Sequence, residues 1–449
     1  MLQRVLAIGV ALLVSAGGVA QGQEGGEDGE SVPIGVSEVA SGLTFPTSMS
    51  VTETGDILVA QKLGKVRLVR DGEVVEDPLA EFRVYPQNEG GLVGIEAMPD
   101  YAESGEFLAF YTPKSNLQKI YLSKLKLEGE TAIVTDEKFL TFPSRNTDRH
   151  FGGGLDFGPD GDLYVGLGEL RQANRSQNTD NLSGSVLRYN ADGTIPEENP
   201  LGSDSAIFAF GFRNGFGVHI DSEGTVWQSE NGGDVADELN RVEKGKNYGW
   251  PEIQGYCDHF PEWEPCRQQE SYVAPAYEFR NVIGPTGLLR YESDRIPQLN
   301  GDMLITGWHS QWVHRFDVKD DKRLEPMPPL FKLGERDKGK ARDSSSLVDV
   351  AQGSDGSILL LESGRQVGRI LKISPIEQET TSQGLEPVTG ENGAQPPASA
   401  SSGDEMATPE GGVDRNGPNA GCSVGGGLPA KGVPAAGLML LAIVGIRRR

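Results

Sequence analysis

One histidine in this 449-residue chain has neighbours that suit proton transfer. His150 begins a glycine-rich turn before a short apolar segment, and the carboxylate of Glu169 follows that segment. An imidazole oriented by a carboxylate is a common general base, and the chain has only five histidines. A histidine at a glycine turn is also often a simple hydrogen-bonding group of its loop, so the pair alone leaves both interpretations open.

Two further loops have residue types that bind charged ligands. Arg213 and Asn214 lie in an apolar, glycine-flanked turn, where they either bind a ligand or bracket loop carbonyls. Segment 229–240 is rich in oxygen donors, namely Glu230, Asp234, Asp237, Glu238 and the carbonyls of Gly232 and Gly233. Such a loop suits Ca²⁺, which accepts oxygen ligands in flexible geometry. The spacing is not that of an EF-hand, and a solvated, metal-free loop is the alternative.

A repeated β unit must position these loops. A turn rich in Gly and Asp, followed by an apolar or alternating strand, recurs with the glycines Gly55, Gly105, Gly161, Gly224, Gly301 and Gly356. Their spacing of about 50 to 77 residues fits one four-stranded sheet per repeat. We therefore predict an all-β fold over residues 32–375, a six-bladed β-propeller with four-stranded antiparallel blades. A two-sheet sandwich is the alternative, although it usually closes in fewer residues.

The two ends of the chain differ in composition from the predicted propeller. Residues 1–20 read as a secretory signal peptide, and 21–31 as a flexible acidic segment. Residues 376–420 are rich in Ser, Gly, Pro and Glu, which predicts a disordered stalk. Residues 421–449 combine a Cys/Gly motif, an apolar segment and three arginines, like the sorting tags of some exported Gram-negative proteins. We expect an exported protein, periplasmic, outer-membrane associated or at the cell surface; a weak membrane anchor is the alternative use of this tail.

Charge and cysteine content agree with an exported location. The formal net charge of −24 argues against nucleic-acid binding, which needs clustered Lys and Arg. Cys257 and Cys266 are close in sequence, and we expect them to form a disulfide in an oxidising compartment. Cys422 belongs to the predicted tag. The absence of CxxC and HExxH motifs leaves little support for a zinc site.

Six segments, in order along the chain, carry a family resemblance. They are Glu89–Gly94, His150–Gly161, Gly184–Arg188, Gly211–Asn214, Asp237–Asn240 and Asn247–Pro251. Together they resemble the soluble glucose and aldose-sugar dehydrogenases, which use pyrroloquinoline quinone (PQQ) on a six-bladed propeller. The resemblance covers nearly all of residues 41–375 and implies oxidation of an aldose or related alcohol at C1, with an external electron acceptor.

The resemblance also implies roles for single residues. His150 would take the proton from the anomeric hydroxyl of the sugar, and Glu169 would orient it. Arg213 would polarise a quinone oxygen next to the carbon that accepts hydride, and Asn214 would hold the cofactor.

Two calcium ions are implied as well. The carbonyls of Gly232 and Gly233 match those that bind the cofactor's Ca²⁺. Glu238 and Tyr248 match a second, structural calcium site.

The chain departs from the family at several positions that contact the cofactor. A glutamine is replaced by Gly90, an arginine by Gly154, a lysine by His309, and two late arginines are lost in Ser346–Asp349. PQQ has three carboxylates, which are costly to bury without partners. The candidate replacements for the lost cations are Arg280, His309, Arg336 and Arg342.

Three functional classes are compatible with these residues. Retention of His150, Glu169, Arg213 and Asn214 favours a PQQ- and calcium-dependent dehydrogenase. Loss of the late arginines favours a catalytically inactive surface propeller that binds carbohydrate or protein. The third class is a propeller hydrolase or lactonase that uses calcium directly.

Overall fold

The computed structural model describes residues 31–376, except 145, 234, 257–271, 320–322, 334–344 and 366–367. The chain divides into two units, Met1–Glu379 and Thr380–Arg449, and the described residues all belong to the first. The predicted signal peptide and C-terminal tag, and the predicted stalk beyond Ile376, therefore lie outside the described residues, as do all three cysteines and their predicted disulfide. Among the described residues, no helix has the length and apolar character needed to cross a membrane.

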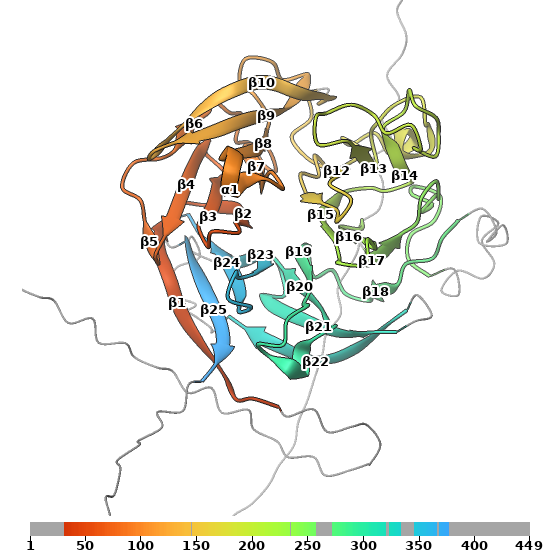
Figure 1. The fold of residues 1–449 in the computed structure, drawn as a ribbon. Coiled ribbons are helices and arrows are strands. Elements are labelled where there is room, and N and C mark those ends of the chain that lie inside the picture. Colours follow the sequence, from red (N-terminus) through yellow and green to blue (C-terminus); the bar gives the residue numbers. More distant parts are fainter. Residues whose placement is uncertain are drawn as a thin grey trace, which may run out of the picture. The chain divides into compact units, whose positions relative to one another are not determined.

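Six antiparallel sheets surround a central axis, and this arrangement confirms the predicted six-bladed propeller (Figure 1). From the axis outwards, the first three sheets contain the following strands. Sheet one has β2 (Pro46–Val51), β3 (Ile57–Gln61) and β4 (Lys65–Arg70), with the short β5 (Glu73–Val74) and β6 (Ala80–Glu81) outermost. Sheet two has β7 (Leu92–Ala97), β8 (Glu106–Tyr111), β9 (Lys119–Glu128) and β10 (Thr131–Pro143). Sheet three has β11 (Leu155–Phe157), β12 (Leu163–Leu167), β13 (Ser185–Tyr189) and β14 (Ile207–Phe210).

The other three sheets repeat this order. Sheet four has β15 (Gly215–Ile220), β16 (Val226–Glu230), β17 (Asp237–Val242) and β18 (Tyr277–Phe279). Sheet five has β19 (Pro285–Arg290), β20 (Met303–Gly307), β21 (Trp312–Val318) and β22 (Leu324–Lys332). Sheet six has β23 (Ser346–Gln352), β24 (Ile358–Ser363), β25 (Gly368–Pro375) and β1 (Ile34–Leu43). Short helices among the described residues are α1 (Tyr101–Ser104), η1 (Ala173–Gln177) and η4 (Pro297–Leu299).

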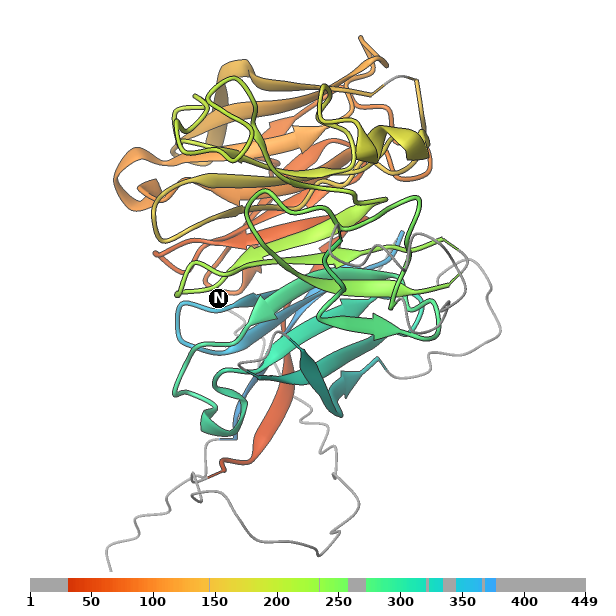
Figure 2. The same ribbon diagram turned by 90° about the vertical axis from the view of Figure 1, so that its right-hand side faces the viewer.

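The ring closes because sheet six takes strands from both ends of the described chain. The early strand β1 pairs antiparallel with the late strand β25, from Ile34 opposite Pro375 to Leu43 opposite Gly368. The red and blue strands lie together in both views (Figure 2). Ring closure of this kind protects most strand edges, which an open sheet would expose.

The predicted turns and the core account for the regularity of the blades. Each of the six predicted glycines has a positive φ, between 66° and 88°, in the turn before the second strand of its sheet. Apolar side chains form six clusters among the described residues, each shared by two neighbouring sheets. In one of them, Phe110 of β8 packs with Val165 of β12 and Phe151 of the intervening loop. Burial between blades thus fixes the loops at the ends of the strands.

Candidate active site

His150 and Glu169 lie in contact on the loops that flank the first two strands of sheet three. Nδ1 of His150 is 2.5 Å from Oε1 of Glu169, and the Glu169 side chain is almost fully buried. The backbone also joins the two loops, since the Leu170 amide donates to the His150 carbonyl at 3.2 Å. Gly152 permits this approach, because a Cβ there would lie 2.3 Å from the Gly166 carbonyl oxygen. The predicted contact between histidine and carboxylate is therefore confirmed.

Glu89 connects His150 to the predicted cofactor-binding residue Asn214. Oε2 of Glu89 accepts the backbone N–H of His150 at 2.6 Å and the side-chain amide of Asn214 at 3.3 Å. The side-chain oxygen Oδ1 of Asn214 in turn accepts the N–H of Gly152 at 3.2 Å. Glu89 lies in a segment that the sequence singled out, but sequence reasoning gave this residue no role of its own. The loops before β7, β11 and β15 thus meet in one hydrogen-bond network.

Arg213 joins the same network through its backbone and its guanidinium group. Its carbonyl accepts the N–H of Glu169 at 2.8 Å. Its Nη1 donates to the Asn231 carbonyl at 2.8 Å, and the guanidinium lies 5.5 Å from the Trp250 ring centroid. The Arg213 amide donates to Oε1 of the buried Glu230 at 2.5 Å. His150, Glu169, Arg213 and Asn214 are therefore brought together, as the sequence predicts.

A cavity of about 290 Å³ lies beside this network, close to the roughly 300 Å³ at which ligand pockets begin. It opens where the inner strands begin, and the residues that line it are Phe45, Pro46, Thr47, Lys62, Asn88, Glu89, Val93, Asn214, Phe216, Asn231, Gly284, Thr286, Trp308, His309, Val348 and Ser363. Two predicted residues, Asn214 and His309, are part of this wall. His150 and Arg213 contact it through their bonds to Glu89 and Asn231.

Arg280 lies elsewhere. It follows β18, the outermost strand of its sheet, and it lines another cavity with Tyr256, His314 and Arg323 among its neighbours. Arg336 and Arg342 lie outside the described residues. Of the two candidate replacement cations that the structure describes, His309 lies at the cavity beside His150 and Arg280 does not.

Lys62 is a wall residue that sequence reasoning missed. It directly follows β3, and Nζ donates to the carbonyls of Asn88 and Gly90 at 2.5 and 2.7 Å. Burial lowers the pKa of this ammonium to about 8, although the Glu89 carboxylate favours the charged form. The position of Lys62 in its blade could have indicated this role. Like Lys62, the residues Glu169, Asn231 and His309 each lie within two residues of the end of the second strand of their sheet.

Two of the departures from the family have a steric reason. At Gly154 a Cβ would lie 2.6 Å from both the Phe216 carbonyl oxygen and the Val218 amide of β15. At Gly90 a Cβ would lie 2.5 Å from the Tyr85 carbonyl oxygen. Neither position has room for the longer side chain that the resemblance implies.

The acidic loop and the strands beside it contain buried oxygens that suit a cation. Glu230 and Glu238 lie directly opposite each other on β16 and β17. Burial raises the pKa of Glu230 well above its ordinary value and that of Glu238 to about 7. Oε2 of Glu230, Oδ1 of Asn240 and Oε1 of Gln228 are buried without a hydrogen-bond partner. These orphaned oxygens fit the needs of Ca²⁺, which prefers carboxylate and amide oxygens.

The structure limits how the other predicted calcium residues take part. The Tyr248 hydroxyl donates to the Arg241 carbonyl at 2.6 Å and accepts the Glu243 amide at 2.8 Å, so it is already engaged in two hydrogen bonds. Gly232 precedes the undescribed residue 234, and its N–H donates to Asp237 at 3.0 Å. Within the described ranges, no three His, Cys, Asp or Glu side chains form a metal cluster by themselves. A calcium site here therefore depends on amide and backbone oxygens as well.

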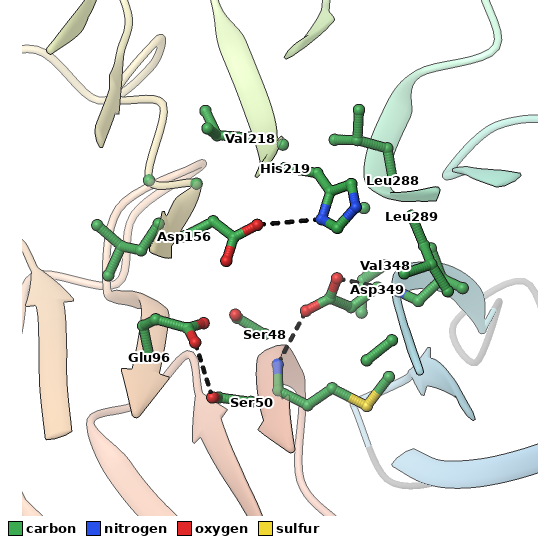
Figure 3. A pocket seen from close by; sticks show the side chains of 18 of the residues that line it. Ser48, Ser50, Glu96, Asp156, Val218, His219, Leu288, Leu289, Val348 and Asp349 are labelled. Carbon is green, nitrogen blue, oxygen red and sulfur yellow. Dashed lines mark hydrogen bonds and ion pairs between the residues drawn. The ribbon is translucent and has the colours of Figure 1, made fainter. Parts of the chain in front are cut away.

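A second cavity, of about 260 Å³, lies farther along the inner strands and contains none of the predicted residues (Figure 3). Thr47 and Phe216 are among the residues that line both cavities, so they form part of the partition between them. The carboxylates of Glu96, Asp156 and Asp349 converge here from β7, β11 and β23.

One of these carboxylates, Asp156, has a neighbouring base. Nδ1 of His219 lies 3.0 Å from Oδ2 of Asp156. Burial is the larger cause, and repulsion from Asp156 a smaller one, that raises the pKa of Glu96 well above its ordinary value. Burial also raises the pKa of Asp349 to about 7.

Comparison with known proteins agrees with this geometry. The family model described as "Glucose / Sorbosone dehydrogenase" matches residues 43–372. Aldose sugar dehydrogenase YliI of Escherichia coli is 28% identical over 333 residues, which span 71% of this chain and 86% of that protein.

Two solved structures are also similar. The apo form of the soluble aldose sugar dehydrogenase of E. coli has a TM-score of 0.66 and 25% identity, and the match covers 77% of this chain and 100% of that one. The PQQ-bound aldose sugar dehydrogenase of Streptomyces coelicolor has a TM-score of 0.62 and 25% identity, with 76% and 98% covered. The match to the family model spans most of the propeller, and the chain belongs to the glucose/sorbosone dehydrogenase family.

Proposed function

We propose that this protein is a PQQ- and calcium-dependent dehydrogenase that oxidises an aldose sugar or a related alcohol at C1. The observation that supports the proposal most strongly is the hydrogen-bonded network of His150, Glu169, Glu89 and Asn214 beside a 290 Å³ cavity. Membership of a sugar dehydrogenase family, with a PQQ-bound structure among the similar ones, supports the same chemistry.

The cavity wall fits a flat, anionic cofactor in part. Phe45, Phe216 and Trp308 supply aromatic surface, Asn214 and Asn231 supply polar groups, and the wall has a buried ammonium, Lys62. When bound, the quinone would accept the hydride from the sugar, which is chemistry that no side chain of the protein can supply. The protein's own residues would bind, orient and move protons.

His150 is the residue that suits proton abstraction. Because Nδ1 lies 2.5 Å from a carboxylate oxygen of Glu169, the proton on the neutral ring belongs at Nδ1. Nε2 then has the lone pair and is the atom that would take the hydroxyl proton of a sugar. The negative charge of Glu169 would stabilise the imidazolium that results.

Arg213 and Asn214 would support the reacting groups electrostatically. The guanidinium of Arg213 is held by the Asn231 carbonyl and the Trp250 ring, so its positive charge is fixed before a ligand arrives. A preorganised charge stabilises developing negative charge without the cost of reorganisation. The amide of Asn214, held by Glu89 and Gly152, would position a ligand in the cavity.

We also propose that Ca²⁺ binds along the acidic loop and that the protein is exported. The buried, unpartnered oxygens of Glu230, Asn240 and Gln228 support a cation near Glu238, and the carbonyls of Gly232 and Gly233 would serve the ion of the cofactor. Export and surface attachment rest on the composition of residues 1–20 and 421–449. Fractionation of cells that produce the full chain, compared with a variant lacking 1–20, tests export: equal cytoplasmic retention of both would contradict it.

The function is tested by reconstituting the purified chain with PQQ and Ca²⁺ and measuring dye reduction with a panel of aldoses. We expect aldose-dependent reduction, and a His150→Ala variant that loses at least about two orders of magnitude in kcat while its Kd for PQQ is unchanged. No spectral change and no dye reduction at high PQQ would remove the enzymatic proposal. That result would favour the alternative of an inactive propeller that binds carbohydrate or protein.

A further inference from the structure

The cavity beside His150 contains a cationic group that the proposed mechanism does not use. Lys62 is 8% exposed, and its Nζ donates to the carbonyls of Asn88 and Gly90 at 2.5 and 2.7 Å. An ammonium has three N–H donors, and these two carbonyls account for two of them. Nζ also lies 5.5 Å from the ring centroid of Phe45, another wall residue.

The rest of the cavity wall offers little positive charge. Among the described residues that line it, only Lys62 and His309 have side chains that can become cationic. Val348 occupies a position where the resemblance predicts an arginine. A ligand with several carboxylates would therefore meet Lys62 as the principal cation of the wall.

Lys62 is costly to bury without an anionic partner beyond Glu89. Desolvation lowers the pKa of its ammonium to about 8, and the Glu89 carboxylate does not compensate for this loss of hydration. Glu89 itself is shared with the His150 amide and Asn214. A carboxylate from a ligand would supply the missing charge at the point where hydration is lost.

We propose that Lys62 binds a carboxylate group of the quinone cofactor, replacing cations that the family has at other positions of this cavity. The inference rests on the proposed function. The position of Lys62 in its blade supports it, because Lys62 follows β3 as Glu169 follows β12 and Asn231 follows β16. In several blades, the residue that follows the second strand thus lies at the same end of the propeller, near the cavity beside His150.

The alternative is that Lys62 only holds the loop at Asn88 and Gly90. The two roles differ in what they predict for ligands of different charge. A carboxylate-binding lysine discriminates between PQQ and its uncharged trimethyl ester, whereas a lysine that holds a loop affects both ligands equally.

The experiment measures Kd for PQQ and for PQQ trimethyl ester by quenching of tryptophan fluorescence, with Ca²⁺ present and no sugar. Trp308 lines the cavity and provides a signal. The variants are Lys62→Met and Lys62→Arg, with the exposed Lys114→Met as the matched control. We expect K62M to raise the Kd for PQQ at least about 30-fold, the lower end for truncating a buried charge pair. K62R should stay within about fivefold of the wild type, and the ester should bind K62M and the wild type alike.

A measurement on the wild type needs no variant. The charged group beside Lys62 is Glu89, and His309 lies on the same cavity wall. As the pH rises above about 8 and Lys62 loses its proton, the Kd for PQQ should rise while that for the ester stays level.

The possible results separate the two proposals. Equal weakening of PQQ and ester in K62M, or a pH-independent Kd for PQQ, overturns the inference and leaves the proposed function standing. If the wild type binds PQQ at no concentration, the proposed function fails and the inference fails with it.

Discussion

Replacement of Glu169 by Gln tests the proposed base with a change of few atoms. Glu169 lies buried with Oε1 2.5 Å from Nδ1 of His150, so Gln keeps the shape of the side chain and removes its charge. Two unit charges about 4 Å apart interact by about 4 kcal/mol at the effective dielectric constant of about 20 that suits protein sites. The imidazolium formed during proton transfer would lose that stabilisation, so we expect kcat to fall by about three orders of magnitude.

The same substitution has a predictable structural side effect. Oε2 of Glu169 accepts the backbone N–H of Gln172, which also donates to the Glu169 carbonyl at 3.1 Å. An amide nitrogen placed at Oε2 would remove the charge-assisted bond and leave this donor only the carbonyl. The expected loss in the free energy of unfolding is about 1–3 kcal/mol. Urea unfolding measures this loss separately from activity, and Glu103→Gln, an exposed residue of α1, is the matched control.

The assay is steady-state dye reduction by the PQQ- and Ca²⁺-loaded protein, with His150→Ala and the double variant measured alongside. Because Glu169 acts through His150, we expect the double variant to be no slower than His150→Ala alone. An E169Q variant that keeps kcat within about threefold of the wild type would refute the reasoning. Additive losses in the double variant would also refute it, since they would assign the two residues independent roles.

Three further predictions concern stability and calcium. Gly152→Ala should destabilise the fold by more than about 3 kcal/mol, because its Cβ would lie 2.3 Å from the Gly166 carbonyl oxygen. Gly161→Ala, at a similar φ but in open space, should cost only about 1–2 kcal/mol. Urea unfolding measures both losses, and equal losses would contradict the steric explanation. Glu96 and Asp349 of the second cavity should make the free energy of unfolding fall as pH rises from about 4 to 7, because in the folded protein they keep protons that the unfolded chain releases. Glu96→Gln should flatten this pH dependence. An unchanged slope in the variant would contradict the prediction. Glu238→Gln should reduce the rise in Tm on adding Ca²⁺, and an identical rise in the variant and the wild type would exclude Glu238 from the calcium site.

The repeat of the fold was predictable because its physical cause is local. Each blade needs a glycine with positive φ before its second strand, so Gly55, Gly161 and the other four recur visibly in the sequence. His150 and Glu169 were also predictable as a pair, since only two short strands, β11 and β12, separate their loops. Such features depend on residues close to one another in the chain.

The features that could not be predicted depend on radial position and on side-chain direction. Arg280 has a suitable charge, but it follows the outermost strand of sheet four and so lies away from the axis. Lys62 has the same charge type as many surface residues, and its role depends on the loop at Asn88 and Gly90 folding over it. Glu96, Asp156 and Asp349 converge on the axis from three blades, and no local pattern marks them.

We propose that the network around His150 serves a bound quinone that receives electrons from a sugar. The most direct test is a single-turnover absorbance measurement on the PQQ- and Ca²⁺-loaded protein, mixed anaerobically with an aldose and no dye. We expect reduction of one equivalent of bound PQQ per chain, at a rate lowered at least about a hundredfold in His150→Ala. A spectrum of the bound quinone that does not change with any aldose would show that this protein does not oxidise aldoses through PQQ.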